Sequence, residues 1–465
     1  MFSKKIRTFS IVAALLAVTF LSILFTGYSA YRRAEDDFSA QRYAVAADSF
    51  AQAAKILIWR DDLWERAGIS ASLGNDPQKA IDYFQQASIL SDEGWVALGS
   101  SYFLLSNFDQ AVIAYQSGLK QHKSPELYRL LASTYRIQKN WSAERDALQN
   151  QILLDSNQDA YTYYRLGLLL TFLDSGQSLP NLLRASSLDP ETDSAVQTLI
   201  AALDLSAAQP DPSQQMVTIG RALGLVSEWE LSTAAFEKAI EFDAENAEAW
   251  AWLGEAKQQN GQSGSVELDK AVQLDHTSVI VRALRGLYWS RLEKYSQMLA
   301  EYLLAAEYDP TNPAWQTQIG IAQAKLGDLV AALRSYQHAT ELAPEDSRYW
   351  QLLAAFCAES SVNLDDIGLP AAEKAVELAP DDPSAMDSLG WTYFASGRYA
   401  NAEKILSDVN DRFPEYLPAH IHLAMTYLAQ GNRSAAQNKL FYVMNADPAG
   451  LYGKEAGRLM QQYFP

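Results

Sequence analysis

Apolar positions recur along this chain with a period close to 34 residues. The period is clearest in two sets of four residues that lie 34 positions apart: Met386, Leu389, Gly390 and Tyr393, then His420, Leu423, Ala424 and Tyr427. Within each set, spacings of three and four residues place the side chains on one face of a helix. A fixed period of this length predicts a stacked helical array, in which each unit buries its apolar face against its neighbours.

The repeated unit resembles the tetratricopeptide repeat (TPR), a family in which two antiparallel helices, A and B, form each unit. The resemblance implies a glycine or alanine in each helix, such as Gly99 and Ala111, so that the two helices approach closely. It also implies large residues, such as Tyr102 and Tyr115, that fill the space between helices. Proline ends helix B in several units, namely at Pro190, Pro310, Pro344, Pro380 and Pro448.

The resemblance covers most of the chain. It predicts an all-α fold, an αα-superhelical solenoid of about 12 TPR units preceded by one transmembrane helix. In the first unit, Phe50 lies in helix B, and helix A begins inside the apolar N-terminal segment. The other units are expected to begin near residues 61, 92, 125, 160, 213, 247, 279, 313, 347, 383 and 417.

One break in the pattern divides the array. Residues 193–212 offer a single helix followed by Gln-Pro-Asp-Pro, so we expect a junction there. It would separate an N-terminal TPR block at 34–192 from a C-terminal TPR block at 213–450. Residues 451–465 are expected to form a capping helix, because a solenoid must cover its last apolar face.

Smaller departures lie within single units. Glu144, Leu148 and Gln151 stand where the family has a small, an aromatic and a small residue, so this helix B is expected to pack atypically. One unit is about two residues short in 261–268, and another is about two residues long around 363–368. Both changes fall at or near the turn between helices A and B, where length changes are tolerated.

The N-terminal segment is apolar enough to cross a membrane. Residues 9–28 contain no charged residue, and as a helix they are long enough for a hydrocarbon layer of ~30 Å. We therefore expect a transmembrane helix at 9–31 after a short N-terminal tail at 1–8. A cleaved signal peptide is the alternative, although its apolar core is normally shorter. Three basic residues precede the span and two follow it, which places the N-terminus in the cytoplasm and the TPR body outside.

The body of the chain is strongly acidic. The formal net charge is −19. Residues 1–33 contain five basic residues and no acidic ones, so the remainder carries −24. This charge disfavours nucleic acid as a partner, since Lys and Arg must neutralise its phosphates. It suits solubility and basic partners.

The repeats leave no room for a catalytic domain, and we expect no enzymatic activity. The HExxH, Walker A, GxSxG and GxGxxG motifs are absent. The single cysteine, Cys357, is expected in the core. His420 is expected to pack between helices, and His422 points to a different side of the same helix. We therefore expect neither a cofactor nor a metal ion.

The concave groove of a TPR array is the expected binding surface for a protein or peptide partner. Two clusters stand out at groove positions. The first is basic and aromatic and could hold a carboxylate or an acidic peptide: Arg129, Arg136, Tyr161, Tyr164 and Arg221. The second is mainly apolar and is the preferred docking site: Asp387, Trp391, Phe394, Ile421, Met425 and Leu428. The first cluster would not be available to a partner if its arginines pair with neighbouring acids. The second would not be available if the C-terminal helix covers it.

Together these features favour a membrane-anchored, non-catalytic TPR scaffold for protein–protein interaction, with a role in assembly of a bacterial cell envelope by analogy. Two alternatives stay open at this point. One is a surface protein that binds a glycan or a small ligand through groove aromatics. The other is a regulatory subunit of a membrane enzyme complex.

Overall fold

The computed structural model describes residues 2–155 and 159–464, and this part of the chain forms 26 α-helices and no β-strand. The all-α prediction is therefore confirmed. Some positions of the predicted segments lie outside the described residues: residue 1 of the tail, residues 156–158 of the N-terminal block and residue 465 of the cap. In the predicted span, the side chains of residues 9, 10 and 12–14 lie outside the description as well.

The helices follow one another in antiparallel pairs. The first thirteen are α1 (Phe2–Ser39), α2 (Tyr43–Ile56), α3 (Asp62–Leu73), α4 (Pro77–Phe84), α5 (Asp92–Leu104), α6 (Phe108–Gln121), α7 (Pro125–Ile137), α8 (Trp141–Leu154), α9 (Ala160–Leu173), α10 (Ser178–Leu188), α11 (Asp193–Ala207), α12 (Pro212–Leu225) and α13 (Trp229–Phe242). The others are α14 (Ala247–Gln259), α15 (Ser265–Leu274), α16 (Val279–Arg291), α17 (Tyr295–Tyr308), α18 (Pro313–Lys325), α19 (Leu329–Leu342), α20 (Ser347–Ser360), α21 (Leu369–Leu378), α22 (Pro383–Ala395), α23 (Tyr399–Arg412), α24 (Leu417–Ala429), α25 (Arg433–Ala446) and α26 (Leu451–Tyr463). Each expected repeat start lies within one residue of the start of a helix.

The chain divides into two compact units. Unit 1 comprises residues 1–210 and 218–231, and unit 2 comprises residues 211–217 and 232–465. Helix α12 contributes residues to both units. The predicted junction at 193–212 consists of helix α11, the loop that follows it and the first residue of α12. Its role as a boundary between two TPR blocks stays a prediction.

Close contact between the two helices of a pair depends on small residues. A Cβ atom added to Gly286 of α16 would lie 2.7 Å from the ring of Tyr302 on α17. A Cβ atom at Gly390 of α22 would lie 2.6 Å from Leu406 on α23. Tyr302 and Leu406 are both buried. Glycine is therefore required where the large side chain of helix B presses on the backbone of helix A.

The atypical helix α8 is explained by a buried ion pair. Glu144 accepts hydrogen bonds from Arg165 of α9, at 2.6 Å from Nε and 3.0 Å from Nη2, and both side chains are almost fully buried. Glu228 lies 3.4 Å from a third guanidinium nitrogen. Gln151 donates to the hydroxyl of Thr162 at 3.3 Å. The polar residues of α8 thus pair with α9 in place of the usual apolar contact.

The two expected changes of repeat length lie between paired helices. The short unit makes its turn from α14 to α15 with two glycines of positive φ, Gly261 and Gly264. The long unit places its extra residues between α20 and α21, where Leu364–Gly368 forms a π-helical turn. Neither change interrupts a helix of the array.

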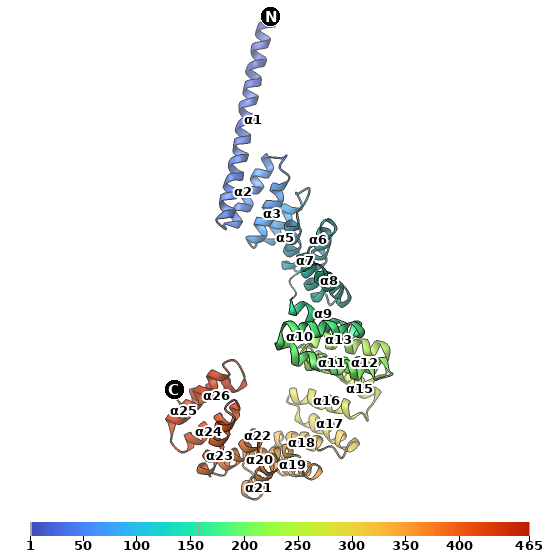
Figure 1. Cartoon of the computed structure of the whole chain (residues 1–465), viewed down its shortest axis with the longest axis vertical. Coiled ribbons are helices and arrows are strands. Elements are labelled where there is room, and N and C mark those ends of the chain that lie inside the picture. The colour runs from blue at the N-terminus through green and yellow to red at the C-terminus, as the bar shows by residue number, and fades with distance from the viewer. Residues whose placement is uncertain (1, 156–158, 465) are drawn as a thin grey trace. The chain divides into compact units, whose positions relative to one another are not determined.

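The second half of α1 serves as helix A of the first repeat. Ala30 and Ala34 are fully buried in a core that also contains Phe50 of α2 and Leu63 of α3. The first half extends beyond this helix pair, as Figure 1 shows. Among the described residues, α1 has the one segment, Leu15–Ser39, that is long and apolar enough to cross a membrane. An N-terminal signal sequence would meet the same criterion.

The close helix contact at Gly286 can be tested by adding one methyl group. Gly286→Ala forces the Tyr302 ring to move, and overpacking of this kind costs about 1–3 kcal/mol of folding free energy. Gly457→Ala in α26 is the matched control, because no atom lies within 4 Å of the added Cβ. Urea unfolding followed by circular dichroism should give a lower midpoint for Gly286→Ala and an unchanged or higher one for the control. Equal midpoints for the two variants would contradict the close-contact argument.

The buried ion pair predicts a non-additive pair of substitutions. Arg165→Met leaves the Glu144 carboxylate buried without its main partner, so a loss of roughly 3–5 kcal/mol in folding free energy is expected. The double variant Glu144→Leu/Arg165→Met removes both charges and should recover most of that loss. A double-mutant cycle by chemical denaturation measures the coupling. If the loss in the double variant equals the sum of the losses in Glu144→Leu and Arg165→Met, the two side chains do not act as a unit.

Candidate functional site

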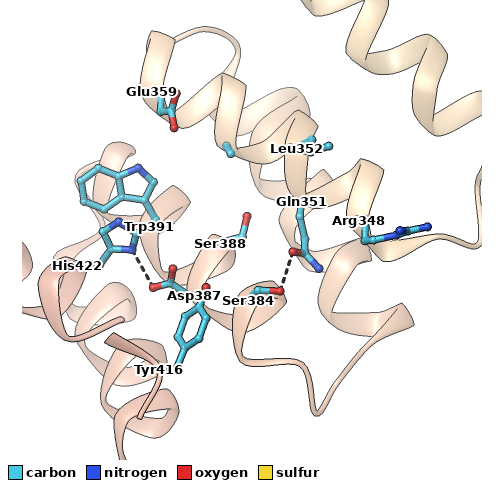
Figure 2. Close-up of a pocket in the computed structure, with 11 residues that line it drawn as sticks. Arg348, Gln351, Leu352, Glu359, Ser384, Asp387, Ser388, Trp391, Tyr416 and His422 are labelled. Atoms are coloured by element: carbon cyan, nitrogen blue, oxygen red, sulfur yellow. Dashed lines mark hydrogen bonds and ion pairs between the residues drawn. The ribbon is translucent and has the colours of Figure 1, made fainter. Parts of the chain in front are cut away.

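Unit 2 contains a pocket of about 370 Å³ on the faces of three consecutive A helices (Figure 2). Helix α20 contributes residues one turn apart, from Arg348 through Gln351 to Glu359. Helix α22 contributes Ser384, Asp387, Ser388 and Trp391, while Tyr416 and His422 come from the start and the first turns of α24. The repeat period places these faces side by side, so the pocket is a product of the array and not of any one unit.

The floor of the pocket is fixed by a polar network at the start of α22. Asp382 caps this helix and accepts hydrogen bonds from the backbone N–H of Ser384 at 3.0 Å and from its hydroxyl at 2.8 Å. Gln351 of α20 donates to Asp382 at 3.0 Å and accepts from the Ser384 hydroxyl at 3.0 Å. The cap thus ties two neighbouring repeats together beside the pocket.

Three stacked rings lie at the pocket, and two of them, Trp391 and His422, line it. Trp391 lies between Phe394 and His422, with ring centroids 4.6 Å and 4.3 Å away and interplanar angles of 10° and 20°. His422 Nδ1 lies 2.8 Å from a carboxylate oxygen of Asp387, as the dashed line in Figure 2 marks. Both faces of the indole are therefore covered by other rings, and Trp391 also lines the pocket.

Asp387 brings a carboxylate into a largely buried position, since only 5% of the residue is exposed. The Ser388 hydroxyl beside it is buried and has no hydrogen-bond partner among the described residues. Burial, followed by the negative charge of Asp387, raises the pKa of Tyr416 well above its usual range. Arg348 pairs with Asp346 at 2.5 Å, which compensates its charge. The pocket therefore offers a buried carboxylate whose partner is the His422 imidazole, with a hydroxyl and aromatic rings around it.

Residues of the predicted apolar cluster line two neighbouring hollows, and Trp391, Ile421 and Met425 share the second of them. Asp387 and Trp391 line the pocket, and Phe394 supports Trp391 from behind. Ile421, Met425 and Leu428 pack in a core cluster with Ala456 and Leu459 of the C-terminal helix α26. A second hollow of about 500 Å³ lies between α24 and α26, and the Trp391–His422 pair also lines it.

The predicted basic cluster lies in unit 1, and most of its side chains have partners. Arg129 forms a two-point ion pair with Glu126 of its own helix, at 2.6 Å and 2.9 Å. Arg136 donates to the phenol oxygen of Tyr161 at 2.7 Å. Burial raises the pKa of Tyr164. Arg221 is exposed on α12.

Sequence reasoning missed His422, Gln351, Ser388 and Tyr416 as pocket residues. His422 is 35 residues from Asp387, and only the crossing of α22 and α24 brings the two side chains together. One feature of the sequence indicates this role: His422 directly follows Ile421, which stands at a predicted groove position. The described residues contain no group of three His, Cys, Asp or Glu side chains that could hold a metal ion.

His420, two residues from His422, belongs to the core. Its ring stacks on Tyr442 at 4.4 Å, and its Nε2 lies 3.0 Å from the carbonyl oxygen of Pro414. Nδ1 is buried with no hydrogen-bond partner among the described residues. Burial lowers the pKa of this imidazole, because protonation would bury a charge and an unpaired N–H.

Comparison with known proteins supports the repeat assignment. Residues 393–449 match the family model "Tetratricopeptide repeat", which covers α23 to α25. The "TPR repeat-containing protein PA4667" of Pseudomonas aeruginosa is 26% identical over 176 residues, which cover 32% of this chain. The chain spans 30% of the length of that curated relative.

Two solved structures have similar helical arrays. The yeast protein Tom70 has a TM-score of 0.42 and 15% identity, and the match covers 94% of this chain and 95% of that one. A tetratricopeptide repeat protein of Parabacteroides merdae has a TM-score of 0.44 and 14% identity, with 54% of this chain and 98% of that one covered. The family-model match and the recurring helix pairs together support tetratricopeptide repeats as the unit of construction.

The buried state of His420 predicts an acid-sensitive fold. Because its pKa is lower in the folded than in the unfolded chain, stability is complete above the unfolded value of about 6.5 and falls as pH drops below it. The urea midpoint of the wild type should therefore decline between neutral pH and pH ~5, and less so in His420→Gln. Tyr163→Phe, a change in unit 1, is the control for effects of substitution alone. An identical decline in His420→Gln and the wild type would assign the acid sensitivity to other groups.

Proposed function

We propose that this chain is a non-catalytic scaffold, held to a membrane by α1, that binds an extended segment of a protein partner across α20, α22 and α24. The observation that carries the proposal is the Asp387 carboxylate, buried at the floor of the pocket beside the ring stack. A buried carboxylate gains most from a cationic partner that brings its own hydrogen-bond donors. The best-fitting contact is therefore a Lys or Arg side chain of the partner.

The surroundings of Asp387 favour the same occupant. Glu359 lines the opposite wall, and the charge of Arg348 is already compensated by Asp346. The overall charge of −19 attracts basic segments at long range. The Trp391 edge and the Ser388 hydroxyl provide an apolar and a polar contact beside the charge. In unit 1, Arg136 and Tyr161 form a second candidate contact for an acidic group of the partner.

Packing of α1 supports an anchor that stays attached. A signal-peptide cleavage after Ala30 would remove Leu24, Gly27 and Ala30, which pack on α2 and the core of the first repeat. Retention of the whole helix keeps that core complete. With more basic residues before the span than after it, we propose a cytoplasmic N-terminus and a repeat body outside the cytoplasm, in a bacterial cell envelope.

The pocket predicts how peptide binding responds to substitution. An array of short peptides probed with the purified full-length chain should give signals from peptides with Lys or Arg next to apolar residues. Asp387→Asn should weaken this binding by about tenfold or more, since a charge-assisted hydrogen bond contributes ~1.5–3 kcal/mol. Trp391→Ala should weaken it as well through loss of the ring stack.

Phe441→Ala is the matched control for the aromatic substitution, because Phe441 is a half-exposed aromatic residue on α25 that does not line the pocket. Its peptide binding should equal that of the wild type. A preference for acidic peptides, or unchanged binding by Asp387→Asn, would rule out the proposed contact.

A further inference from the structure

The loop between α2 and α3 exposes two large apolar side chains to solvent. Ile58 is 77% exposed and Trp59 is 58% exposed, whereas the preceding Leu57 is buried in the core of the first repeat. The backbone N–H of Arg60 donates to the carbonyl oxygen of Leu57 at 2.8 Å, which closes a tight turn with Ile58 and Trp59 at its tip. Ile58 and Trp59 together form an exposed apolar tip, and its position in the fold indicates what it contacts.

The tip lies beside the end of the predicted membrane span. A Cβ atom on Gly27 of α1 would come within 2.7 Å of Ile56 and 2.9 Å of Leu57, so the end of α2 rests directly on α1 at this residue. Leu24 packs on the same core. The predicted span continues to residue 31, four residues beyond Gly27. At 1.5 Å per residue, the end of α2 therefore lies about 6 Å inside the end of the span, on the side of the bilayer centre.

The residues of α1 around this level are those expected at a membrane–water interface. Phe25 and Tyr28 are exposed, and Arg32 and Arg33 follow one turn later. On the loop side, the Arg60 guanidinium lies 4.9 Å from the Tyr31 ring centroid and pairs with Asp62 at 2.7 Å. Aromatic rings and arginines with long apolar stems favour this depth, because their apolar parts meet acyl chains while their polar ends reach water.

We infer that the α2–α3 loop inserts Ile58 and Trp59 into the interfacial layer of the bilayer, as a second membrane contact beside α1. The inference rests on the proposed membrane anchor, since α1 sets the depth of the loop. The partner is the lipid surface itself. Membrane contacts by a helix and by a separate loop restrain the tilt of the first repeat, which a single spanning helix does not.

The experiment places one environment-sensitive fluorophore at a time on cysteine variants of the full-length chain in phosphatidylcholine nanodiscs. Ile58→Cys reports the loop, and Leu21→Cys, an exposed position within the span, reports the anchor. Ala40→Cys in the turn between α1 and α2 is the control, because it lies thirteen residues, or about 20 Å, beyond Gly27 along α1. Cys357 stays unlabelled, since it is fully buried and burial raises the pKa of its thiol to about 11.

In nanodiscs, lipids with a spin label near the headgroup should quench the fluorophore at position 58. Lipids with a spin label deep in the acyl chain should quench that at position 21, which lies ten residues, or about 15 Å, inside the end of the predicted span. Neither label should quench the fluorophore at position 40. Trp59→Ser in the Ile58→Cys background should reduce the quenching at position 58. If position 21 is quenched while position 58 behaves like position 40, the loop contact is wrong and the anchor stands. If position 21 is not quenched either, both the anchor and the loop contact are wrong. Circular dichroism of each variant confirms that the helices are intact.

Discussion

The close approach of helix A to helix B within each repeat is the constraint on which the rest of this structure depends. It exists because a glycine or alanine on one helix receives a large side chain of the other, as Gly286 receives Tyr302. Each such contact fixes the spacing between successive A helices. That spacing decides which side chains share a surface, and so it produces the pocket between α20, α22 and α24. A change in pair geometry therefore alters the site even where no site residue is touched.

Charged residues replace this apolar contact at a few places. Between α8 and α9 the side chains of Glu144 and Arg165 are buried together, and their attraction offsets part of the cost of removing both from water. In the pocket, Asp387 is buried as well, and the nearest charged or ionisable partner is the imidazole of His422 at 2.8 Å. The Glu144 carboxylate pairs with an arginine of the fold, whereas we propose that the Asp387 carboxylate accepts a further hydrogen bond from a ligand. This difference separates a structural polar residue from a candidate binding residue.

The terminal helices of the array have different roles. At the C-terminus, α26 covers Ile421 and Leu428, which would otherwise leave an apolar face in water. At the N-terminus, α1 supplies helix A of the first repeat, so the proposed membrane anchor and the first core are parts of one continuous helix. Any force on the membrane segment is therefore transmitted directly to packed residues of the first repeat.

The sequence alone determined the helical pairs and their starts, because the small and large residues that set the pair contact recur at fixed spacing along the chain. It also predicted Asp387 and Trp391 at binding positions of one helix, and both line the pocket. Only the tertiary structure decided that His422 meets Asp387, that Trp391 is covered on both faces, and that Ile421 faces the cap helix. These contacts join residues of different repeats, and they depend on crossing angles and side-chain rotamers. A periodic pattern specifies which face a residue occupies, but not what that face meets.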